Sequence, residues 1–305
     1  MNIREIGNCL RIATPAKLNL FLEILERRDD GFHELETIMT KLSVHDVLDF
    51  TLATDEQTCL NVISSPPIEH GNVPEDESNL IIKALQLVRD LAGQTQGITI
   101  RLFKNIPVQA GLGGASGNAA GAIVAANRIW KLNWPLERLL EIAGQIGSDV
   151  AFFLANSLAQ CTGRGERVHN LNYPRCLNVV IAKPNCGMST AEIYSRCIVP
   201  SEPISSKSIL SGLHQGPVSR IGKSLFNRLE EFAAVGHPEV ARMRTEFGKT
   251  NSVGHQLTGS GSCYFGIYHN RRSMLSAAKI LATRLPDMHV FTGQTLSSRN
   301  HCLQI

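Results

Sequence analysis

The chain has 305 residues, of which 43% are hydrophobic and 19% charged, and its formal net charge is +3. This balance excludes disorder as the main state, and it excludes a dominant electrostatic attraction to nucleic acid or to a membrane surface. The length suits two domains of roughly 150 residues each. No apolar run reaches the roughly 18 residues of a membrane span, and the amino terminus lacks the layout of a signal peptide. We therefore expect a cytoplasmic protein with no nucleic-acid, membrane or obligate protein partner.

The eight cysteines fit a reducing compartment, because none of them forms a C-x-x-C motif or the framework of a small secreted domain. Cys176, Cys186 and Cys197 are almost evenly spaced, but zinc ligands are usually paired at shorter intervals. We expect reduced thiols that behave as small hydrophobic side chains.

The spacing of apolar residues predicts a mixture of strands and helices in the first half of the chain. In chain order we expect strands at 18–24 and 37–52, a helix at 79–92, a strand at 98–102, helices at 116–131 and after Pro135, and an apolar strand at 150–154.

The same reading predicts strands and helices in the second half. In chain order we expect a strand at 179–182, a connection rich in proline and serine at 200–211, helices near 221–235 and 238–248, a strand at 263–268, a helix at 273–285 and a closing strand at 289–292. Because strands and helices do not alternate in a strict βαβ rhythm, the fold class is α+β, and we place two lobes at 1–165 and 166–305.

Residues 107–120, which read PVQAGLGGASGNAA, contain four glycines within seven residues. Glycine permits positive φ angles and lets the backbone approach a ligand closely. A helix that begins directly after such a turn presents unpaired N–H groups to an anion, most commonly a phosphate. The segment is neither a Walker A motif nor the dinucleotide fingerprint. The alternative is a tight turn that packs a helix of small residues against a sheet.

Two charged residues are placed where apolar ones would otherwise stand. Lys17 lies in the predicted strand that begins PAKLNL, and Asp149 lies in GSDVAFF, between the end of a helix and an apolar run. Each by itself is compatible with an ordinary solvated or paired charge. With a phosphate-binding loop they supply three parts of a phosphoryl-transfer site, namely a cradle, a cation and a carboxylate that faces a hydroxyl.

These segments, together with LTGSGSCYF at 257–265, resemble the motifs of the GHMP small-molecule kinases. Within that superfamily PAKLNLFLEILERRDDGFHELET is most similar to the family of 4-diphosphocytidyl-2-C-methyl-D-erythritol kinases, and the similarity runs through nearly the whole chain. The resemblance implies a ribosomal-protein-S5-like amino-terminal lobe, a ferredoxin-like α/β-sandwich carboxy-terminal lobe and an active site in the cleft between them. It also implies ATP with Mg²⁺ as the donor and the 2-hydroxyl of 4-diphosphocytidyl-2-C-methyl-D-erythritol as the acceptor.

Carried over by position, the resemblance makes Asp149 the base that accepts the hydroxyl proton, and it makes Lys17 the catalytic lysine that stabilises developing negative charge. It assigns ATP binding to Pro107, Val108, Gln109, Ala110, Gly111, Leu112, Gly113, Gly114, Ala115, Ser116 and Gly117, with Ser116 also facing the metal. It assigns contacts with the diphosphocytidyl group to Asn19, Phe32, His33 and Tyr194. For Phe32 and Tyr194 the alternative is core packing, and for His33 it is a position in a surface turn.

The loop departs from the usual family pattern GLGGGSS(N/D)AA at two positions, where Ala115 replaces a glycine and Gly117 replaces a serine. Alanine at 115 is tolerated only if its φ is negative, and the lost hydroxyl at 117 could weaken contact with phosphate or metal. These departures leave open a nucleotide-binding pseudokinase. Another GHMP kinase that acts on a smaller alcohol also stays open.

Overall fold

The computed structural model describes residues 1–64 and 73–297. Its first sheet has eight strands within these residues, and the main path runs β1-β2-β3-β5-β4, while β6 pairs with β3, β7 with β6, and β9 with β2. The strands are β1 (Asn2–Ile6), β2 (Cys9–Arg27), β3 (His33–Leu52), β4 (Cys59–Ser64), β5 (Ile98–Lys104), β6 (Leu158–Thr162), β7 (Arg167–Asn170) and β9 (Phe226–Asn227).

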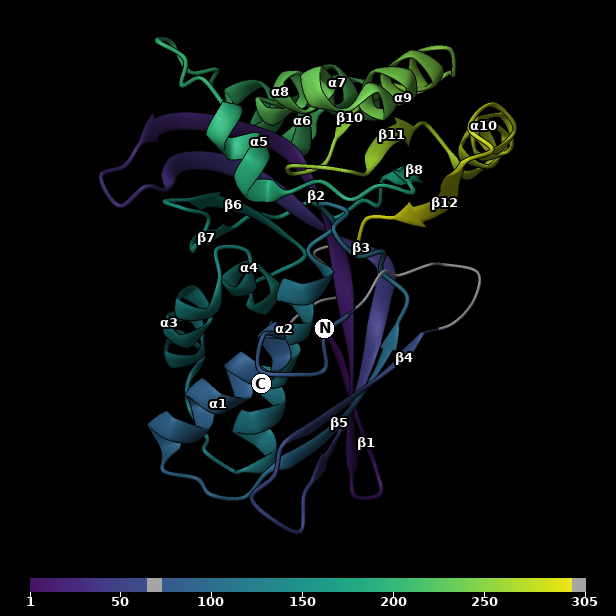
Figure 1. The fold of residues 1–305 in the computed structure, drawn as a ribbon. Helices are drawn as coiled ribbons and strands as arrows, with labels where there is room; N and C mark the ends of the chain where they lie inside the picture. Colours follow the sequence, from purple (N-terminus) through teal and green to yellow (C-terminus); the bar gives the residue numbers. More distant parts are fainter. Residues whose placement is uncertain (65–72, 298–305) are drawn as a thin grey trace.

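Four described helices of the first half share a hydrophobic core with this sheet and lie together in the lower part of Figure 1. They are α1 (Leu80–Ala92), α2 (Gly114–Ile129), α3 (Leu136–Ile146) and α4 (Val150–Leu154). Helix α2 contacts both β2 and β3, and its buried residues are mainly alanines and glycines, so the helix approaches the sheet closely.

The second sheet is antiparallel and runs in the order β10-β11-β8-β12. Its strands are β8 (Asn178–Pro184), β10 (Gly254–Leu257), β11 (Tyr264–Tyr268) and β12 (Met288–Gln294). The helices of this half lie around it in the upper part of Figure 1: α5 (Thr190–Arg196), α6 (Lys207–Gln215), α7 (Val218–Lys223), α8 (Leu229–Gly236), α9 (Pro238–Gly248) and α10 (Arg271–Arg284). No helix of the described ranges is long and apolar enough to cross a membrane.

The β2–β3 hairpin connects the two halves, because its strands of 19 and 20 residues extend over about 60 Å and run through both. Ile12 belongs to a core with α1–α4, Leu20 belongs to a central core with the second sheet, and Ile24 belongs to a core with α8, α9 and α10. One hairpin therefore supplies apolar side chains to three successive cores.

A buried ion pair fixes the far end of this hairpin to the second half. Glu23 is fully buried, and its two carboxylate oxygens accept hydrogen bonds from Nε and Nη2 of Arg228 at 2.7 Å each. The backbone N–H of Ile204 donates to the same carboxylate at 2.8 Å. Arg228 directly follows β9, which pairs with β2. The ion pair and the short parallel pairing therefore join the same two segments of the chain.

The predicted α+β class and most predicted elements are confirmed, but three predictions of secondary structure are wrong. Residues 150–154 form a helix, because an apolar run that is buried on all sides has no periodicity to separate strand from helix. The helix predicted at 221–235 is interrupted by β9, which leaves the helical path to pair with β2. The connection predicted at 200–211 already contains the start of α6 at Lys207.

The predicted lobe boundary at 165/166 falls in the turn between β6 and β7, two strands that pair with each other in the first sheet. The division into 1–165 and 166–305 stays a prediction. The seven cysteines within the described residues are free thiols, and Cys302 lies outside those residues.

Replacing Arg228 with methionine should lower the free energy of unfolding by about 3–5 kcal/mol, because the buried Glu23 carboxylate would lose its countercharge. The matched control is Arg242→Met, which removes an exposed ion pair with Asp287 and should cost about 1 kcal/mol or less. Urea denaturation of both variants measures the difference. Equal losses in the two variants would show that the Glu23–Arg228 pair does not hold the hairpin.

Candidate active site

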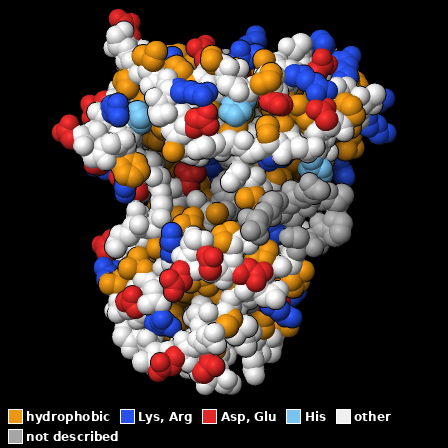
Figure 2. Space-filling model, viewed as in Figure 1, with side chains coloured by type: hydrophobic (Ala, Val, Ile, Leu, Met, Phe, Trp, Pro, Cys, Tyr) orange, Lys and Arg blue, Asp and Glu red, His pale blue; other side chains and the backbone are white. Residues whose placement is uncertain are grey.

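A cleft of about 1180 Å³ lies between the two halves of the molecule, and it collects nearly all of the predicted site residues. The surface narrows at this level in the space-filling view (Figure 2). The predicted residues that line the cleft are Lys17, Asn19, Phe32, His33, Pro107, Val108, Gln109, Ala110, Gly111, Leu112, Gly113, Gly114, Ala115, Ser116, Asp149 and Tyr194. Gly117 is the predicted residue that does not line it.

The glycine loop enters α2 through backbone conformations that favour glycine. Gly111 has φ +71° and Gly113 has φ +68°, and Gln109 adopts φ +50°. Gly113 is the N-cap of α2, and no side chain of the described residues caps the helix, so the N–H groups of its first turn are left for a ligand. A cleft that ends on these N–H groups fits the phosphates of ATP.

The loop also lies against the backbone of the second half. A Cβ on Gly111 would collide with the carbonyl group of Thr258. The Thr258 hydroxyl donates to the Gly111 carbonyl at 3.3 Å, and the Cys263 N–H donates to the Ala110 carbonyl at 3.1 Å. The positive φ at Gly111 therefore permits a close contact between the two halves.

Both departures from the family loop are accommodated without strain. Ala115 lies exposed in the first turn of α2 with helical backbone, so its methyl group meets the condition of negative φ. Gly117 is buried, and a Cβ there would lie 3.2 Å from the Pro15 carbonyl oxygen and 3.3 Å from the Phe153 ring. A serine at 117 would thus face the packed interior and not the cleft.

The buried carboxylate of Asp46 holds the glycine loop through hydrogen bonds to residues on both sides of it. Asp46 accepts hydrogen bonds from Nζ of Lys104 at 2.7 Å and from Nδ2 of Asn118 at 2.9 Å, and also from the backbone N–H groups of Asn105 and Ile106 at 2.7 and 2.8 Å. Burial lowers the pKa of Lys104, while the charge of Asp46 opposes this shift. The network ties the end of β5 to the second turn of α2 and so fixes both ends of the loop.

Lys17 is buried at an irregular point of β2, where the pairing register with β3 shifts between Pro15 and Lys17. Such a bulge redirects a side chain within a strand. Its Nζ lies 3.5 Å from Oδ2 of Asp149 and donates to Oδ1 of Asn19 at 2.5 Å. The structure thus brings together the two residues predicted to be catalytic.

Asn19 holds Lys17 in place. Its Nδ2 donates to the Thr37 hydroxyl at 2.9 Å, which fixes the amide so that Oδ1 faces Lys17. Its backbone N–H donates to the Thr258 hydroxyl at 3.2 Å. Asn19 lines the cleft, but much of its hydrogen-bonding capacity is used inside the protein, so we assign it a positioning role beside the predicted contact with substrate.

Asp149 stands at the N-cap of α4 with its side chain 34% exposed, so it opens to the cleft while Lys17 is buried behind it. The other end of α4 is held by Lys41, whose Nζ donates to the carbonyl oxygens of Phe153 at 2.9 Å and Ala155 at 2.5 Å. Burial lowers the pKa of Lys41 to about 7. Lys41 thereby sets the position of the helix that carries Asp149.

Aromatic side chains gather at the other part of the cleft. The rings of His33 and Tyr194 lie 5.5 Å apart, and the Arg164 guanidinium lies 4.9 Å from the centre of the Phe32 ring. Phe32 is 50% exposed, which excludes core packing for that ring. Tyr194 is partly buried, and it both lines the cleft and packs against the core that contains Ile193 and Leu229. Burial, and to a smaller extent the charge of Arg27, lowers the pKa of His33, which favours the neutral imidazole.

Comparison with known proteins shows the family to which this chain belongs. Residues 79–157 match the model of the GHMP kinases N terminal domain. A 4-diphosphocytidyl-2-C-methyl-D-erythritol kinase of Bacillus cytotoxicus is 35% identical over 270 residues, which cover 87% of this chain and 90% of that one. One of Caldicellulosiruptor bescii is 33% identical over 286 residues, with 93% and 98% covered. The chain belongs to the 4-diphosphocytidyl-2-C-methyl-D-erythritol kinase family.

Solved structures agree with this membership. The crystal structure of a 4-(cytidine 5'-diphospho)-2C-methyl-D-erythritol kinase superposes with a TM-score of 0.74 at 28% identity, covering 93% of this chain and 98% of that one. A homoserine kinase from Cytophaga hutchinsonii has the same TM-score at 16% identity, with 97% of each chain covered, and this likeness concerns the fold alone. The predicted two-lobed GHMP kinase fold and the resemblance are confirmed, and ATP is the phosphoryl donor in this superfamily.

The sequence alone did not identify several residues that lie in the cleft or directly behind it. Thr258 bridges Asn19 and Gly111, and Ser260 lines the cleft with its hydroxyl 2.8 Å from that of Thr190. Arg164 belongs to the cleft through its contact with Phe32. The LTGSGS segment was available as a signal for Thr258 and Ser260, since it matches a family motif. The segment GRGER at 163–167 also resembles a family stretch, but the resemblance gave Arg164 no role.

Replacing Gly111 with alanine should weaken ATP binding by about tenfold or more, because the added Cβ both strains a positive φ and collides with the Thr258 carbonyl. Calorimetric titration with ATP measures the effect, and circular dichroism checks the fold. The matched control is Ala115→Gly in the same loop, which should change the affinity by less than about threefold, since that position is exposed and helical. Equal affinities in the two variants would contradict the close approach at Gly111.

Proposed function

We propose that the protein transfers the γ-phosphoryl group of ATP to the 2-hydroxyl of 4-diphosphocytidyl-2-C-methyl-D-erythritol. The products are the 2-phosphate and ADP, and the reaction belongs to non-mevalonate isoprenoid precursor biosynthesis. The observation that carries this proposal is the 3.5 Å separation of Lys17 and Asp149 in a cleft that ends on the glycine loop. Relatives of that name at 33–35% identity support the choice of acceptor.

In the proposed step, the hydroxyl oxygen forms a bond to the γ-phosphorus while the bond from that phosphorus to the bridging oxygen breaks. ADP leaves with the electron pair, and Asp149 takes the hydroxyl proton. The Lys17 ammonium faces the same point and stabilises the negative charge that develops on the attacking oxygen and on the transferred group. Asn19 and Thr37 keep the ammonium in this position.

The chain also offers a partner for the Mg²⁺ that accompanies ATP. Ser116 lines the cleft in the first turn of α2 and is only partly buried, so its hydroxyl oxygen is open to a hard cation. When bound with ATP, the ion would neutralise phosphate charge. We propose Ser116 as its protein contact.

The aromatic side chains provide the proposed seat for the cytosine. Phe32 and Tyr194 line the cleft with exposed ring surface, and each ring that stacks on a base contributes about 1–3 kcal/mol. The imidazole of His33 lines the same cleft with its ring 5.5 Å from that of Tyr194, and a neutral imidazole both donates and accepts hydrogen bonds. The proposal includes the expectations that the enzyme acts in the cytoplasm and needs no nucleic-acid, membrane or obligate protein partner.

Replacing Asp149 with asparagine should lower turnover by about 10²-fold or more and leave ATP affinity nearly unchanged, because the variant loses the proton acceptor but keeps the loop. ADP release with Mg-ATP, with and without 4-diphosphocytidyl-2-C-methyl-D-erythritol, measures turnover, and phosphorus NMR follows the new phosphomonoester. The matched control is Asp287→Asn, an exposed aspartate that pairs with Arg242. Turnover within a few-fold of the wild type in Asp149→Asn would show that Asp149 is not the base.

The alternative of a binding-only pseudokinase rests on Ala115 and Gly117. The double variant Ala115→Gly/Gly117→Ser restores the family pattern, and we expect it to change kcat/KM by less than about threefold, since 115 is helical and 117 faces away from the cleft. A gain of tenfold or more, from a wild type that binds ATP without turnover, would favour the pseudokinase. ADP release with homoserine or mevalonate in place of the cytidyl substrate would favour another GHMP kinase.

A further inference from the structure

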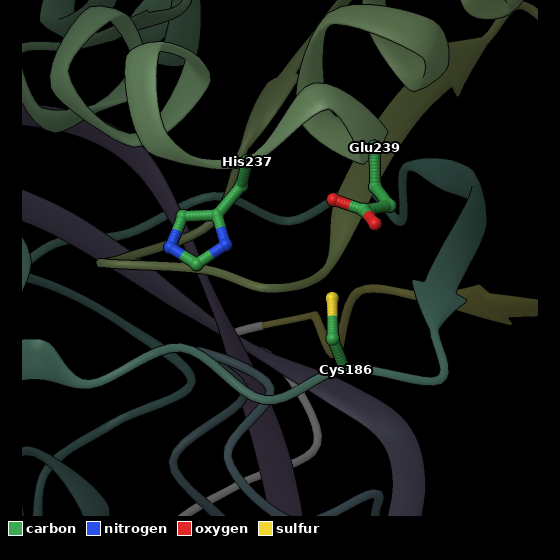
Figure 3. Close-up of side chains that lie close together, drawn as sticks. All are labelled: Cys186, His237 and Glu239. Atoms are coloured by element: carbon green, nitrogen blue, oxygen red, sulfur yellow. The ribbon is translucent and has the colours of Figure 1, made fainter.

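Three side chains of metal-ligating type converge outside the cleft. Cys186 lies in the loop after β8, His237 immediately precedes α9, and Glu239 lies in the first turn of α9. Their ligand atoms all lie within 4.8 Å of one another. Figure 3 shows the three side chains pointing toward a common space, with one ring nitrogen of His237 facing the gap between the thiol and the carboxylate.

The ligand atoms of this cluster have no other use within the described part of the chain. The structure gives none of the three side chains a hydrogen bond or ion pair to another described residue. The ring nitrogen of His237 that faces the cluster in Figure 3 is Nδ1, while Nε2 lies on the far side of the ring, where it is buried without a partner among the described residues. Partly buried polar groups are normally paired, because an unpaired group loses its hydration without compensation. A cation held by all three would pair the thiol sulfur, the carboxylate and Nδ1 of His237.

The donor set selects the class of cation. One sulfur, one imidazole nitrogen and one carboxylate oxygen are the ligands of Zn²⁺ and related borderline metals, whereas Mg²⁺ and Ca²⁺ prefer oxygen alone. Tetrahedral ligands at zinc distances lie roughly 3.3–3.8 Å from one another, so a closure of about 1 Å by side-chain rotation completes the site. We propose that Cys186, His237 and Glu239 bind a Zn²⁺-type cation, with the fourth position taken by water.

The surrounding charge is compatible with this site. Lys183 is the cation nearest along the chain, and its Nζ donates to the carbonyl oxygens of Pro184 at 2.6 Å and Cys186 at 2.8 Å. Its charge is thus directed at the backbone, where it stabilises the shape of the loop. The thiolate and the Glu239 carboxylate together carry two negative charges, which outweigh the single ammonium.

The proposed cation site lies outside the cleft, but the loop that contains Cys186 extends into the cleft. None of the three residues lines the cleft, whereas Gly187 and Met188 do. The Cys186 carbonyl accepts a hydrogen bond from the Ser262 hydroxyl at 3.0 Å, and a Cβ on Gly187 would collide with the Gln109 side chain. A bound cation would therefore join α9 to the segment that packs directly against the glycine loop.

The test uses the full chain, stripped of metal and free of nucleotide. Zn²⁺ titrated against a chromophoric chelator should bind at one equivalent with a dissociation constant below about 1 µM. Co²⁺ in place of Zn²⁺ should give sulfur-to-metal charge-transfer absorption and the visible bands of a tetrahedral site. Cys186→Ser, His237→Asn and Glu239→Gln should each weaken Zn²⁺ binding by about tenfold or more.

Matched controls are Cys197→Ser and Glu231→Gln, which change a cysteine and a glutamate of the same half outside the cluster and should leave binding unchanged. Protection of Cys186 from alkylation by Zn²⁺, mapped by mass spectrometry on the wild type, tests the site without any variant. The proposal is overturned if the wild type binds less than half an equivalent, if Zn²⁺ fails to protect Cys186, or if the charge-transfer band persists in folded Cys186→Ser.

Discussion

The arrangement of the active site depends on a single buried cation. Lys17 lies inside the protein, where an unpaired ammonium would be strongly destabilising, so it must be held by groups that accept its hydrogen bonds and balance its charge. Asn19 and Asp149 do this from two different elements, β2 and the start of α4. The need to compensate one charge therefore brings the Asp149 carboxylate to the strand that carries the lysine. The reaction that we propose uses the same electrostatic arrangement that stabilises the fold.

The remaining parts of the site fix the position of Lys17 and Asp149 relative to the glycine loop. Asp46 holds the loop from the side of the first sheet, while Thr258 holds it from the side of the second. Lys41 fixes the far end of α4 through backbone carbonyls. Each of these supports comes from a residue distant in sequence from the group that it positions. Together they set the geometry in which ATP and an alcohol would meet.

Features that depend on neighbouring residues could be predicted from the sequence, whereas features that depend on contacts between distant segments could not. Gly111 and Gly113 were identifiable because their backbone conformations are a local property, and the helix at 79–92 had its own periodicity. The short strand β9 and the helix α4 were not identifiable, because pairing with β2 and burial on all sides come from distant segments. Cys186 was considered as a metal ligand only with other cysteines, since its neighbours His237 and Glu239 are brought close by the packing of α9.

The length of the β2–β3 hairpin has a consequence for the order in which the chain folds during synthesis. Leu22, Ile24 and Leu35 leave the ribosome long before Leu281 and Met288, which belong to the core that covers them. Until those residues emerge, the far end of the hairpin exposes apolar surface and an uncompensated Glu23. Such surface is prone to aggregation and is recognised by chaperones. The far end of the hairpin that joins the two halves is therefore fully packed only after the segment that contains Leu281 and Met288 has been synthesised.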